Sequence, residues 1–357
     1  MFKKINKALV VIFFLSIELG CSNPVTKPQD TTTENKMYVY SNYGNTFYLV
    51  DYKTFEVVKE IQLSVPDTVK CNGMILSTDR NYLFFKAEGQ YPSPPFGFTV
   101  YDIENEKLEN IFFTEFRDAE PAYFISAQNN SEPGLIYVHF RDFGTYSIDL
   151  FEQNTKELIS DEHDFDLDKR IFNSPDGKWT VIMKNFMELE FYSTSSGLHD
   201  LQFTLNENAV DSISIYDFEF SNNNKLFITY QLSEGRSRDI ESYFGSYDLE
   251  TKQLYRSSLK FPWSLSGYYL AYSSNRNEVY AVGSSGQFYI IDPDTYSIKD
   301  TINLSVGGEQ SPIVITPDDN FAFVAYPNSN SIFVIDLNKR KIIKTISIDE
   351  PYNMIIP

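Results

Sequence analysis

Cysteine, histidine and basic residues are all scarce in this chain of 357 residues. It has two cysteines, Cys21 and Cys71, and three histidines, with 30 Lys and Arg against 49 Asp and Glu. Two cysteines exclude a scaffold stapled by several disulfides. The histidines, His139, His163 and His199, have no paired spacing, so we expect no zinc site and no cofactor. A net charge of −19 without clustered cations makes nucleic acid an unexpected partner.

Long hydrophobic runs and helical periodicity are missing as well. No stretch after residue 20 sustains an apolar period of about 3.6 residues, and none approaches the ~18 apolar residues of a membrane-spanning helix. The sequence also has no Gly-x-Ser-x-Gly elbow, Gly-rich phosphate loop or His-Glu-x-x-His motif. These absences exclude the local signatures of the commonest hydrolases, nucleotide-binding proteins and metalloproteases.

A segment of about 40 to 50 residues recurs along the chain, and a period of that size indicates a solenoid or propeller. Each copy has an apolar strand, a Ser/Thr-x-Asp/Asn turn, a second aromatic strand, a third strand ending in Asp, and a fourth rich in Ile, Lys and Thr. The alternation of Phe321, Phe323 and Ala325 is typical of strands. The repeat therefore predicts four-stranded antiparallel blades and an all-β fold.

Two sets of landmarks count the copies. The turn opener recurs at six positions, namely Ser77, Ser126, Ser174, Ser221, Ser273 and Thr316. The end of the third strand recurs at seven, namely Asp51, Asp102, Asp149, Ser193, Asp248, Asp292 and Asp336. The missing first strand is found at the C-terminus, because Met354-Ile-Ile-Pro357 matches Val314-Ile-Thr-Pro317. We therefore predict a seven-bladed β-propeller whose ring closes when residues 351–357 pair with the blade of residues 37–63, which covers both sheet edges.

The last complete copy carries a family resemblance. Pro312-Ile-Val-Ile-Thr-Pro-Asp-Asp-Asn-Phe-Ala-Phe-Val-Ala-Tyr326, followed by Ser331-Ile-Phe-Val-Ile-Asp336, resembles the YVTN-type β-propeller repeat of bacterial and archaeal surface proteins. Copies near Met37 and Glu278 resemble it too, whereas those between about residues 64 and 260 have drifted. The resemblance extends to the seven-bladed lactonase and quinoprotein-like propellers. It implies a scaffold over residues 37–357, and the repeat carries no catalytic residues of its own.

The N-terminus predicts export. Three lysines precede the apolar run Ala8 to Ile17, which is too short to span a bilayer and reads as a signal peptide over residues 1–20. Leu19-Gly20-Cys21 resembles the lipobox of bacterial lipoproteins, although Glu18 stands where an apolar residue is usual. An ordinary signal with a chance cysteine is the alternative. We expect a lipidated Cys21 and a flexible tether over residues 21–36, with membrane contact through the lipid anchor only.

The residue after the lipobox cysteine refines the expected location. An Asp directly after the cysteine would resemble the inner-membrane retention signal of some bacterial lipoproteins, and this chain has Ser22 there. We therefore expect an exported protein anchored to the outer membrane of a bacterium, facing the periplasm or the cell surface.

The remaining cysteine and the many aromatic residues are expected to pack. Cys71 begins an inner strand, where a small apolar thiol is usually buried. Aromatic residues make up 16% of the chain and suit the wedges between blades. Aromatic rings also stack on sugars, and we single out five that lie in or near loops, although packing is the preferred role: Tyr91, Phe96, Trp263, Tyr268 and Tyr269.

In known propellers, function concentrates where the fourth-to-first and second-to-third connections surround the mouth of the channel. On this register the longest such loops are residues 86–97, 114–122, 160–170, 231–242 and 261–268. Asp164-Phe-Asp-Leu-Asp168 has the spacing of a calcium loop, but Lys169 replaces the required Gly and Pro175 the closing Glu. A solvated strand end is therefore the preferred reading of these acids.

Two functions remain open. One is a lipid-anchored scaffold of the cell envelope that binds an envelope protein or a glycan. The other is a propeller enzyme similar to the sugar lactonases, with general acid-base groups at the channel mouth. Its candidate catalytic residues are Arg170, Arg141, His163 and Glu120. We prefer the binding scaffold, because lactonases of this type act on phosphorylated cytoplasmic sugars, whereas this chain carries an export signal.

Overall fold

The computed structural model describes much of the chain from Asn35 to Pro357, and these residues form one compact unit. The described residues are 35–41, 45–63, 65, 69–77, 79–89, 97–108, 112–113, 121–126, 135–140, 144–151, 154–159, 171–174, 178–185, 188–193, 199–204, 212–221, 225–233, 240–249, 251, 253–261, 268–308 and 312–357. The predicted signal peptide, Cys21 and nearly all of the tether lie outside them.

The described elements are strands, with one short 3-10 helix, η1 (Pro327–Ser329). In chain order the strands are β1 (Lys36–Ser41), β2 (Thr46–Asp51), β3 (Glu56–Gln62), β4 (Val69–Leu76), β5 (Tyr82–Gly89), β6 (Gly97–Asp102), β7 (Lys107–Leu108), β8 (Phe112–Phe113), β9 (Pro121–Ser126), β10 (Leu135–Phe140), β11 (Gly144–Asp149), β12 (Asn154–Ile159), β13 (Ile171–Asn173), β14 (Trp179–Asn185), β15 (Glu188–Ser193), β16 (His199–Thr204), β17 (Ser212–Phe220), β18 (Lys225–Ser233), β19 (Ile240–Asp248), β20 (Gln253–Phe261), β21 (Tyr268–Ser273), β22 (Glu278–Gly283), β23 (Gln287–Ile291), β24 (Ile298–Asn303), β25 (Val314–Ile315), β26 (Phe321–Tyr326), β27 (Ser331–Asp336), β28 (Lys341–Ser347) and β29 (Pro351–Ile355).

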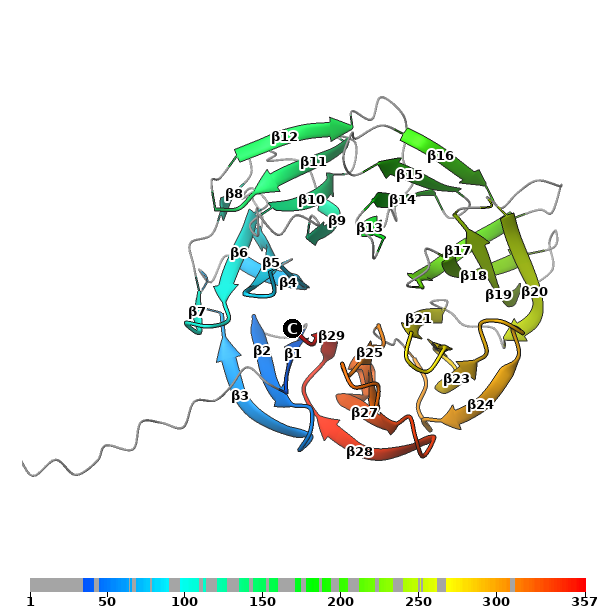
Figure 1. The fold of residues 1–357 in the computed structure, drawn as a ribbon. Coiled ribbons are helices and arrows are strands. Elements are labelled where there is room, and N and C mark those ends of the chain that lie inside the picture. Colours follow the sequence, from blue (N-terminus) through cyan, green and yellow to red (C-terminus); the bar gives the residue numbers. More distant parts are fainter. Residues whose placement is uncertain are drawn as a thin grey trace, which may run out of the picture. The chain divides into compact units, whose positions relative to one another are not determined.

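These strands form antiparallel sheets, which we name A to G in chain order. Sheet A contains β29, β1, β2 and β3, sheet B contains β4 to β8, and sheets C to G take the following strands four at a time. The first strand of each sheet lies nearest the common centre and the last lies outermost (Figure 1). In sheet A the innermost place belongs to β29, which pairs with β1 through Tyr38 opposite Ile355 and Val39 opposite Met354.

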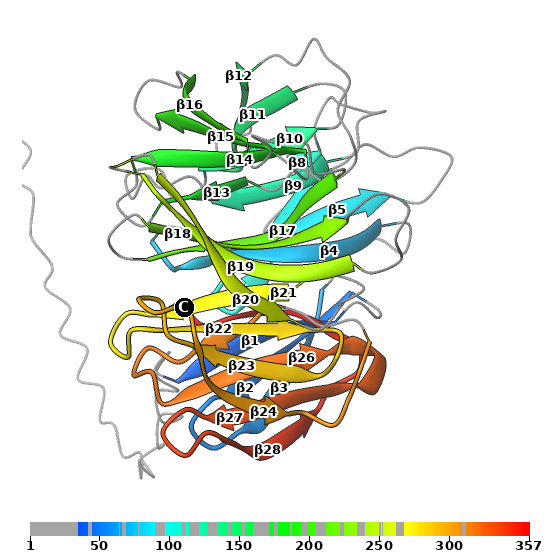
Figure 2. The same cartoon turned by 90° about the vertical axis from the view of Figure 1, so that its right-hand side faces the viewer.

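Burial follows the position of a strand within its sheet. Every residue of β22 is buried, and in β26 only the first is not, because both faces of a middle strand are covered by neighbouring sheets. Outermost strands such as β3 and β28 are largely exposed. The long strands of sheet E show the right-handed twist that lets adjacent sheets pack face to face (Figure 2).

The core is divided among the junctions between successive sheets. Tyr40, Phe47 and Phe85 lie in one cluster that joins sheet A to sheet B, with Phe47 and Phe85 ring centroids 5.3 Å apart. A corresponding cluster joins sheet G to sheet A, through Phe323 and Met354. Similar clusters join B to C, D to E, E to F and F to G, and β9 contacts β13 between sheets C and D.

The Ser/Thr turn opener has a clear structural role. In sheet B, the Ser77 amide donates to the Tyr82 carbonyl at 2.9 Å, and the Ser77 hydroxyl accepts the Tyr82 amide at 3.0 Å. Three further openers form the same pair of hydrogen bonds, namely Ser174 with Trp179, Ser221 with Lys225, and Thr316 with Phe321. A side-chain oxygen that takes the place of a backbone carbonyl closes the turn between the first two strands.

The Asp at the end of the third strand closes the next turn. Asp292 Oδ1 accepts the amides of Asp294 and Thr295 at 2.9 Å each. The hydrogen bond from the Thr295 amide is the main reason that the pKa of Asp292 is lowered, because it stabilises the carboxylate. The same Asp turn occurs at Asp51, Asp102, Asp149, Asp248 and Asp336.

The residue four positions after this Asp reaches back to the preceding sheet. Four such residues, which we call clasp residues, have a positive φ between 50° and 60°: Phe55, Glu106, Tyr296 and Arg340. The Phe55 ring lies 5.0 Å from the Phe321 ring of sheet G, and Glu106 forms ion pairs with Lys59 and Lys36 of sheet A. The left-handed backbone thus turns a large side chain onto the neighbouring sheet, at a cost that the contact must offset.

Sheet B departs from the expected four-stranded blade. Its outer part is split, so that β7 pairs with Tyr101 and Asp102, while β8 pairs with Gly97 and Phe98. Between these pairs lies Thr99, whose buried Oγ1 is the one buried side-chain polar atom without a hydrogen-bond partner among the described residues. Among the described residues, no strand pairs with Thr99 and Val100 on that side.

Candidate functional site

The predicted catalytic residues and most of the loops that carry them lie outside the described residues. This holds for Glu120, Arg141, His163 and Arg170. Among the aromatic candidates, Tyr91, Phe96 and Trp263 also lie outside, and Tyr268 is described only as part of β21. Tyr269 packs against the core cluster between sheets F and G, in line with its expected packing role.

The corresponding turns of sheets A, F and G, which carry none of these loops, are described. The turn between the second and third strands has a left-handed residue in sheets A and G, Asn45 and Asn330. The Asn45 carbonyl accepts the Leu63 amide at 2.8 Å, and its side-chain Oδ1 accepts the Cys71 amide at 2.6 Å. One residue therefore fixes both ends of the connection from the last strand of sheet A to the first strand of sheet B, through its carbonyl at one end and its side chain at the other.

Asn330 repeats this arrangement at the connection from sheet G to sheet A. Its carbonyl accepts the Ile348 amide at 3.1 Å, and its Oδ1 accepts the Glu350 amide at 3.0 Å. In sheet F, Gly286 takes the same left-handed position, and its carbonyl accepts the Leu304 amide at 2.8 Å. A Cβ at Gly286 would stand 1.6 Å from the Val306 carbonyl oxygen, so only glycine fits there. At sheets A, F and G the rim is thus held by backbone and side-chain hydrogen bonds between sequence-distant residues.

Two carboxyl groups lie on β17, the innermost strand of sheet E. Asp217 is 6% exposed, and its Oδ2 accepts the Leu270 amide of sheet F at 2.7 Å. Glu219 lies two residues further along the same face. Burial, together with the charge of Asp217, raises the pKa of Glu219 from 4.5 to about 8, opposed by a hydrogen bond from the Phe220 amide. A pKa of about 8 keeps most of the Glu219 carboxyl protonated at neutral pH, which is the state that a general acid needs.

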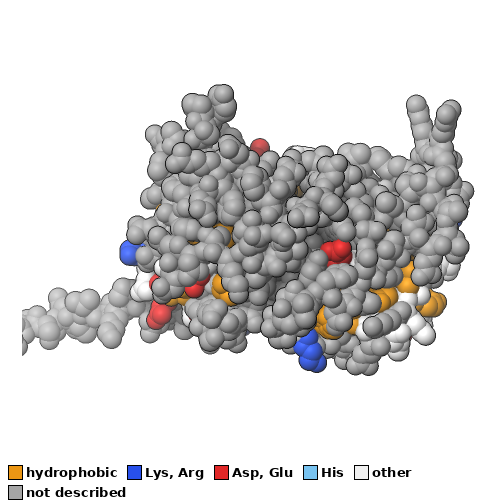
Figure 3. All heavy atoms as spheres, turned by 90° about the horizontal axis from the view of Figure 1, so that it is seen from above, with side chains coloured by type: hydrophobic (Ala, Val, Ile, Leu, Met, Phe, Trp, Pro, Cys, Tyr) orange, Lys and Arg blue, Asp and Glu red, His pale blue; other side chains and the backbone are white. Residues whose placement is uncertain are grey.

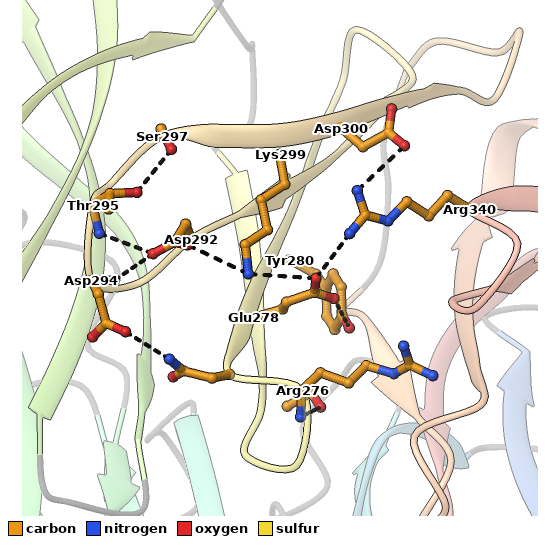
Figure 4. A network of polar contacts seen from close by, with 12 residues as sticks. Arg276, Glu278, Tyr280, Asp292, Asp294, Thr295, Ser297, Lys299, Asp300 and Arg340 are labelled. Atoms are coloured by element: carbon orange, nitrogen blue, oxygen red, sulfur yellow. Dashed lines mark hydrogen bonds and ion pairs between the residues drawn. The ribbon is translucent and has the colours of Figure 1, made fainter.

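A second charged group joins sheets F and G. Glu278, whose side chain is 8% exposed, accepts a hydrogen bond from the Tyr280 hydroxyl at 3.0 Å. Its Oε1 lies 3.2 Å from Arg340 Nη2 and 3.6 Å from Lys299 Nζ, and Lys299 also pairs with Asp292 at 3.5 Å (Figure 4). Because cations and carboxylates alternate through this network, its charges compensate one another. We interpret it as an ion-pair network that holds sheets F and G together.

The Cys71 thiol is fully buried in the cluster between sheets A and B. Burial raises its pKa to about 12, so the thiolate that a nucleophile needs is not formed near neutral pH. The Tyr40 hydroxyl donates to the Cys71 carbonyl, which ties the residue to β1 through its backbone. Cys71 is a packing residue, as its position in the sequence predicts.

The described side chains include no group of three or more His, Cys, Asp or Glu that could hold a metal ion. No helix in the described ranges is long and apolar enough to cross a membrane. On the side shown in Figure 3, the coloured hydrophobic and charged side chains lie in small separate groups.

Comparison with known proteins supports the fold. No protein-family model matches the sequence, and no curated protein matches it. The solved structure of hydrazine synthase from Kuenenia stuttgartiensis is similar with a TM-score of 0.63 at 14% identity, over 85% of this chain and 92% of that one. The dihydro-heme d1 dehydrogenase NirN, in complex with DHE, is similar with a TM-score of 0.61 at 11% identity, over 92% of this chain and 76% of that one. Both are β-propeller proteins, and this chain has a β-propeller fold.

Proposed function

We propose that the chain is a lipid-anchored binding scaffold of the bacterial cell envelope, built on a closed seven-bladed ring of the YVTN type. The seven sheets and the pairing of β29 with β1 support the count and the closure. The lipobox-like Leu19-Gly20-Cys21 supports lipidation of Cys21, and the apolar run before it supports export. Ser22 in place of Asp favours the outer membrane.

The observation that carries the binding role is the rigid rim. Asn45 and Asn330 fix the connections from sheet A to sheet B and from sheet G to sheet A with hydrogen bonds of 2.6 to 3.1 Å, so this part of the rim is well defined. A rigid frame lowers the entropy cost of binding, because the loops lose less freedom when a partner docks. We propose an envelope protein or a glycan as that partner, and no nucleic acid, since the chain carries a net charge of −19.

An enzyme is the second candidate, and Glu219 is the observation that favours it. A carboxyl with a pKa of about 8 beside a second carboxyl is the kind of group that catalytic sites use as an acid. In this alternative, the loop residues Glu120, Arg141, His163 and Arg170 would supply the remaining groups for lactone hydrolysis. A hydrolysis assay on a panel of sugar lactones, with Glu219→Gln as the comparison, tests it. Equal rates with and without the protein would exclude this activity.

Two measurements in intact cells test the scaffold. Cells that express the full chain are fed labelled palmitate, with Cys21→Ala as the control, and proteins and glycans that crosslink to the chain are recovered. We expect label that disappears in the control, together with a reproducible partner. An unlabelled soluble protein without a partner would contradict both the anchor and the scaffold.

A further inference from the structure

The chain enters the ring at a defined end of sheet A. Strand β1 begins at Lys36, which lies opposite Asp51, the residue that opens the turn between β2 and β3. The Asn35 carbonyl accepts the Tyr52 amide of this turn at 2.9 Å, and Lys36 pairs with Glu106 of sheet B at 3.8 Å. The Asp turns and the Ser/Thr turns lie at the same ends of the strands, because antiparallel strands alternate in direction. We call this side of the ring the turn face, and it is where the tether is attached.

The rim lies at the opposite ends of the same strands. In sheet A it holds the turn between β1 and β2, with Asn45, and in sheet G the turn between β26 and β27, with Asn330. The strands between the two sides have six residues in β1 and nine in β17. At about 3.3 Å per residue, the turn face and the rim are about 20–30 Å apart.

The tether is short compared with this height. Only 14 positions separate Cys21 from Asn35. A flexible chain of that length has a root-mean-square span of about 20 Å and a fully extended length of about 46–50 Å. Sheet A places β2 and β3 outside β1. To bring the rim to the membrane that holds Cys21, the tether would have to pass these two strands, about 10 Å, and then follow the full height of the ring.

The charges of the two sides act in the same direction. The turn face carries both signs: three exposed cations, namely Lys53, Arg80 and Lys341, form no ion pair within the described part of the chain and lie among the Asp residues of the turns. At the rim, residues 114–120 lead into β9, and residues 160–170 join β12 to β13. These two segments hold eight Asp and Glu against three Lys and Arg. An anionic lipid surface would repel them.

We propose that the turn face is turned toward the lipid surface that holds Cys21, and that the rim faces away from it. The lipid anchor and the short tether set this orientation, so no separate adsorption of the ring on lipid is needed. A partner then reaches the rim from the aqueous side. A protein embedded in the same membrane would have to rise above the ring, by about 20–30 Å, to do so. This inference rests on the proposed lipid anchor and adds the direction from which a partner approaches.

Fluorescence quenching by a lipid headgroup tests the orientation. The lipidated full chain, purified in detergent, is inserted into preformed phosphatidylcholine vesicles in which some headgroups carry a nitroxide. A fluorophore is attached to one added cysteine at either end of two outermost strands on different sides of the ring (Figure 1). The turn-face positions are Glu56→Cys on β3 and Gln253→Cys on β20, and the matched rim positions are Gln62→Cys and Lys260→Cys, all of them exposed. The parent chain should take up no label, because Cys71 is buried and the Cys21 thiol is acylated.

We expect quenching at least about twofold stronger at the turn-face end of both strands, because about 20 Å separates the two ends. Vesicles with added phosphatidylglycerol should preserve the difference. A segment of about 30 Gly and Ser residues inserted after Thr33 should remove it in neutral vesicles, because the root-mean-square span of the tether then becomes about 35–40 Å and exceeds the height of the ring. Matching thermal unfolding of the labelled variants controls for misfolding.

Equal quenching at both ends of each strand, or stronger quenching at the rim, would overturn the orientation. A difference that survives the inserted segment in neutral vesicles would overturn the role of the tether. Flotation of the vesicles separates these failures from failure of the anchor, with Cys21→Ala as the unlipidated comparison. If the wild type floats with the vesicles and its labels are quenched equally, the anchor stands and the orientation does not. If the wild type does not float, the proposed anchor fails and this inference fails with it.

Discussion

Arg340 and Glu278 come from neighbouring sheets, and Arg340 Nη2 lies 3.2 Å from Glu278 Oε1. Arg340 is a clasp residue of sheet G, and Glu278 begins the second strand of sheet F. Arg340 also lies 3.7 Å from Asp300, so one guanidinium contacts two strands of the preceding sheet. Because the Glu278 carboxylate is nearly buried, this pair is less screened by solvent than an ordinary surface ion pair.

Replacing Arg340 by Ala should lower the free energy of unfolding by about 1–2 kcal/mol, because a nearly buried carboxylate loses one of its two cationic partners. Denaturant titration measures this change, and Lys341→Ala, an exposed neighbour, should be nearly neutral. A double-mutant cycle with Glu278→Gln should give a coupling of about 1 kcal/mol. Additive effects of the two changes would show that the pair does not stabilise the junction.

The C-terminal strand should be essential for stability. Met354 on β29 is 3% exposed and packs in the cluster that joins sheets G and A. Met354→Ala should therefore cost about 2–4 kcal/mol through lost burial and a residual cavity. Val58→Ala, at a position that is 58% exposed on β3, should change stability by less than about 0.5 kcal/mol. Equal unfolding curves for both variants would contradict the packing of β29.

The Asn353 side chain, also on β29, tests the contact of this strand with sheet B. Its Nδ2 donates to the Met74 carbonyl of sheet B at 2.6 Å. Asn353→Ala should cost about 1 kcal/mol, because the Met74 carbonyl loses its side-chain donor. Hydrogen–deuterium exchange of β4 should rise in this variant. Unchanged exchange would mean that the bond does not form in solution.

The Cys71 thiol should be inert in the folded protein. With a pKa of about 12 and no exposed surface, it should resist a disulfide reagent for hours at about pH 8. The Cys21→Ala variant leaves Cys71 as the sole thiol, so the released chromophore reports on it alone. One equivalent should appear only in concentrated guanidinium chloride. Rapid release from the native variant would show that the junction between sheets A and B opens.

Glu219 should make the protein less stable as the pH rises. Its pKa is raised from 4.5 to about 8, so the folded state holds a proton that the unfolded state has lost between these values. Stability should therefore fall with pH across this window, by at most about 1.4 kcal/mol per unit. Glu219→Gln should flatten that slope, whereas Glu104→Gln, at an exposed position, should keep it. Parallel pH profiles for wild type and Glu219→Gln would refute the assignment.

The sequence predicts the turns and the strand pattern because these depend on local chemistry. The opener Ser77 and the terminal Asp292 act within five residues of their own positions, so a repeated motif reveals them. The clasp residues were missed, because Phe55, Glu106, Tyr296 and Arg340 share a backbone conformation and a direction but no side-chain chemistry. A large side chain four positions after the Asp is the signal that could have found them.

The candidate sites were harder to predict than the fold. The pKa of Glu219 depends on burial and on Asp217, and neither effect has a motif. The stacking of Tyr255 on Tyr296 likewise comes from the packing of two sheets and not from spacing in the chain. The predicted catalytic residues Glu120, Arg141, His163 and Arg170 lie outside the described residues, and they stay predictions.

Three of the four clasp residues are synthesised after the strands that they contact. Glu106 contacts β1 and β3 of sheet A, Tyr296 contacts sheet E and Arg340 contacts sheet F, so each of these clasp residues leaves the ribosome after the strands that it holds. Phe55 is the exception, because it was synthesised long before the Phe321 that it contacts. The growing chain can therefore secure its sheets in order of synthesis. The pairing of β1 with β29 comes late in this order, because the two strands lie about 300 residues apart in the chain.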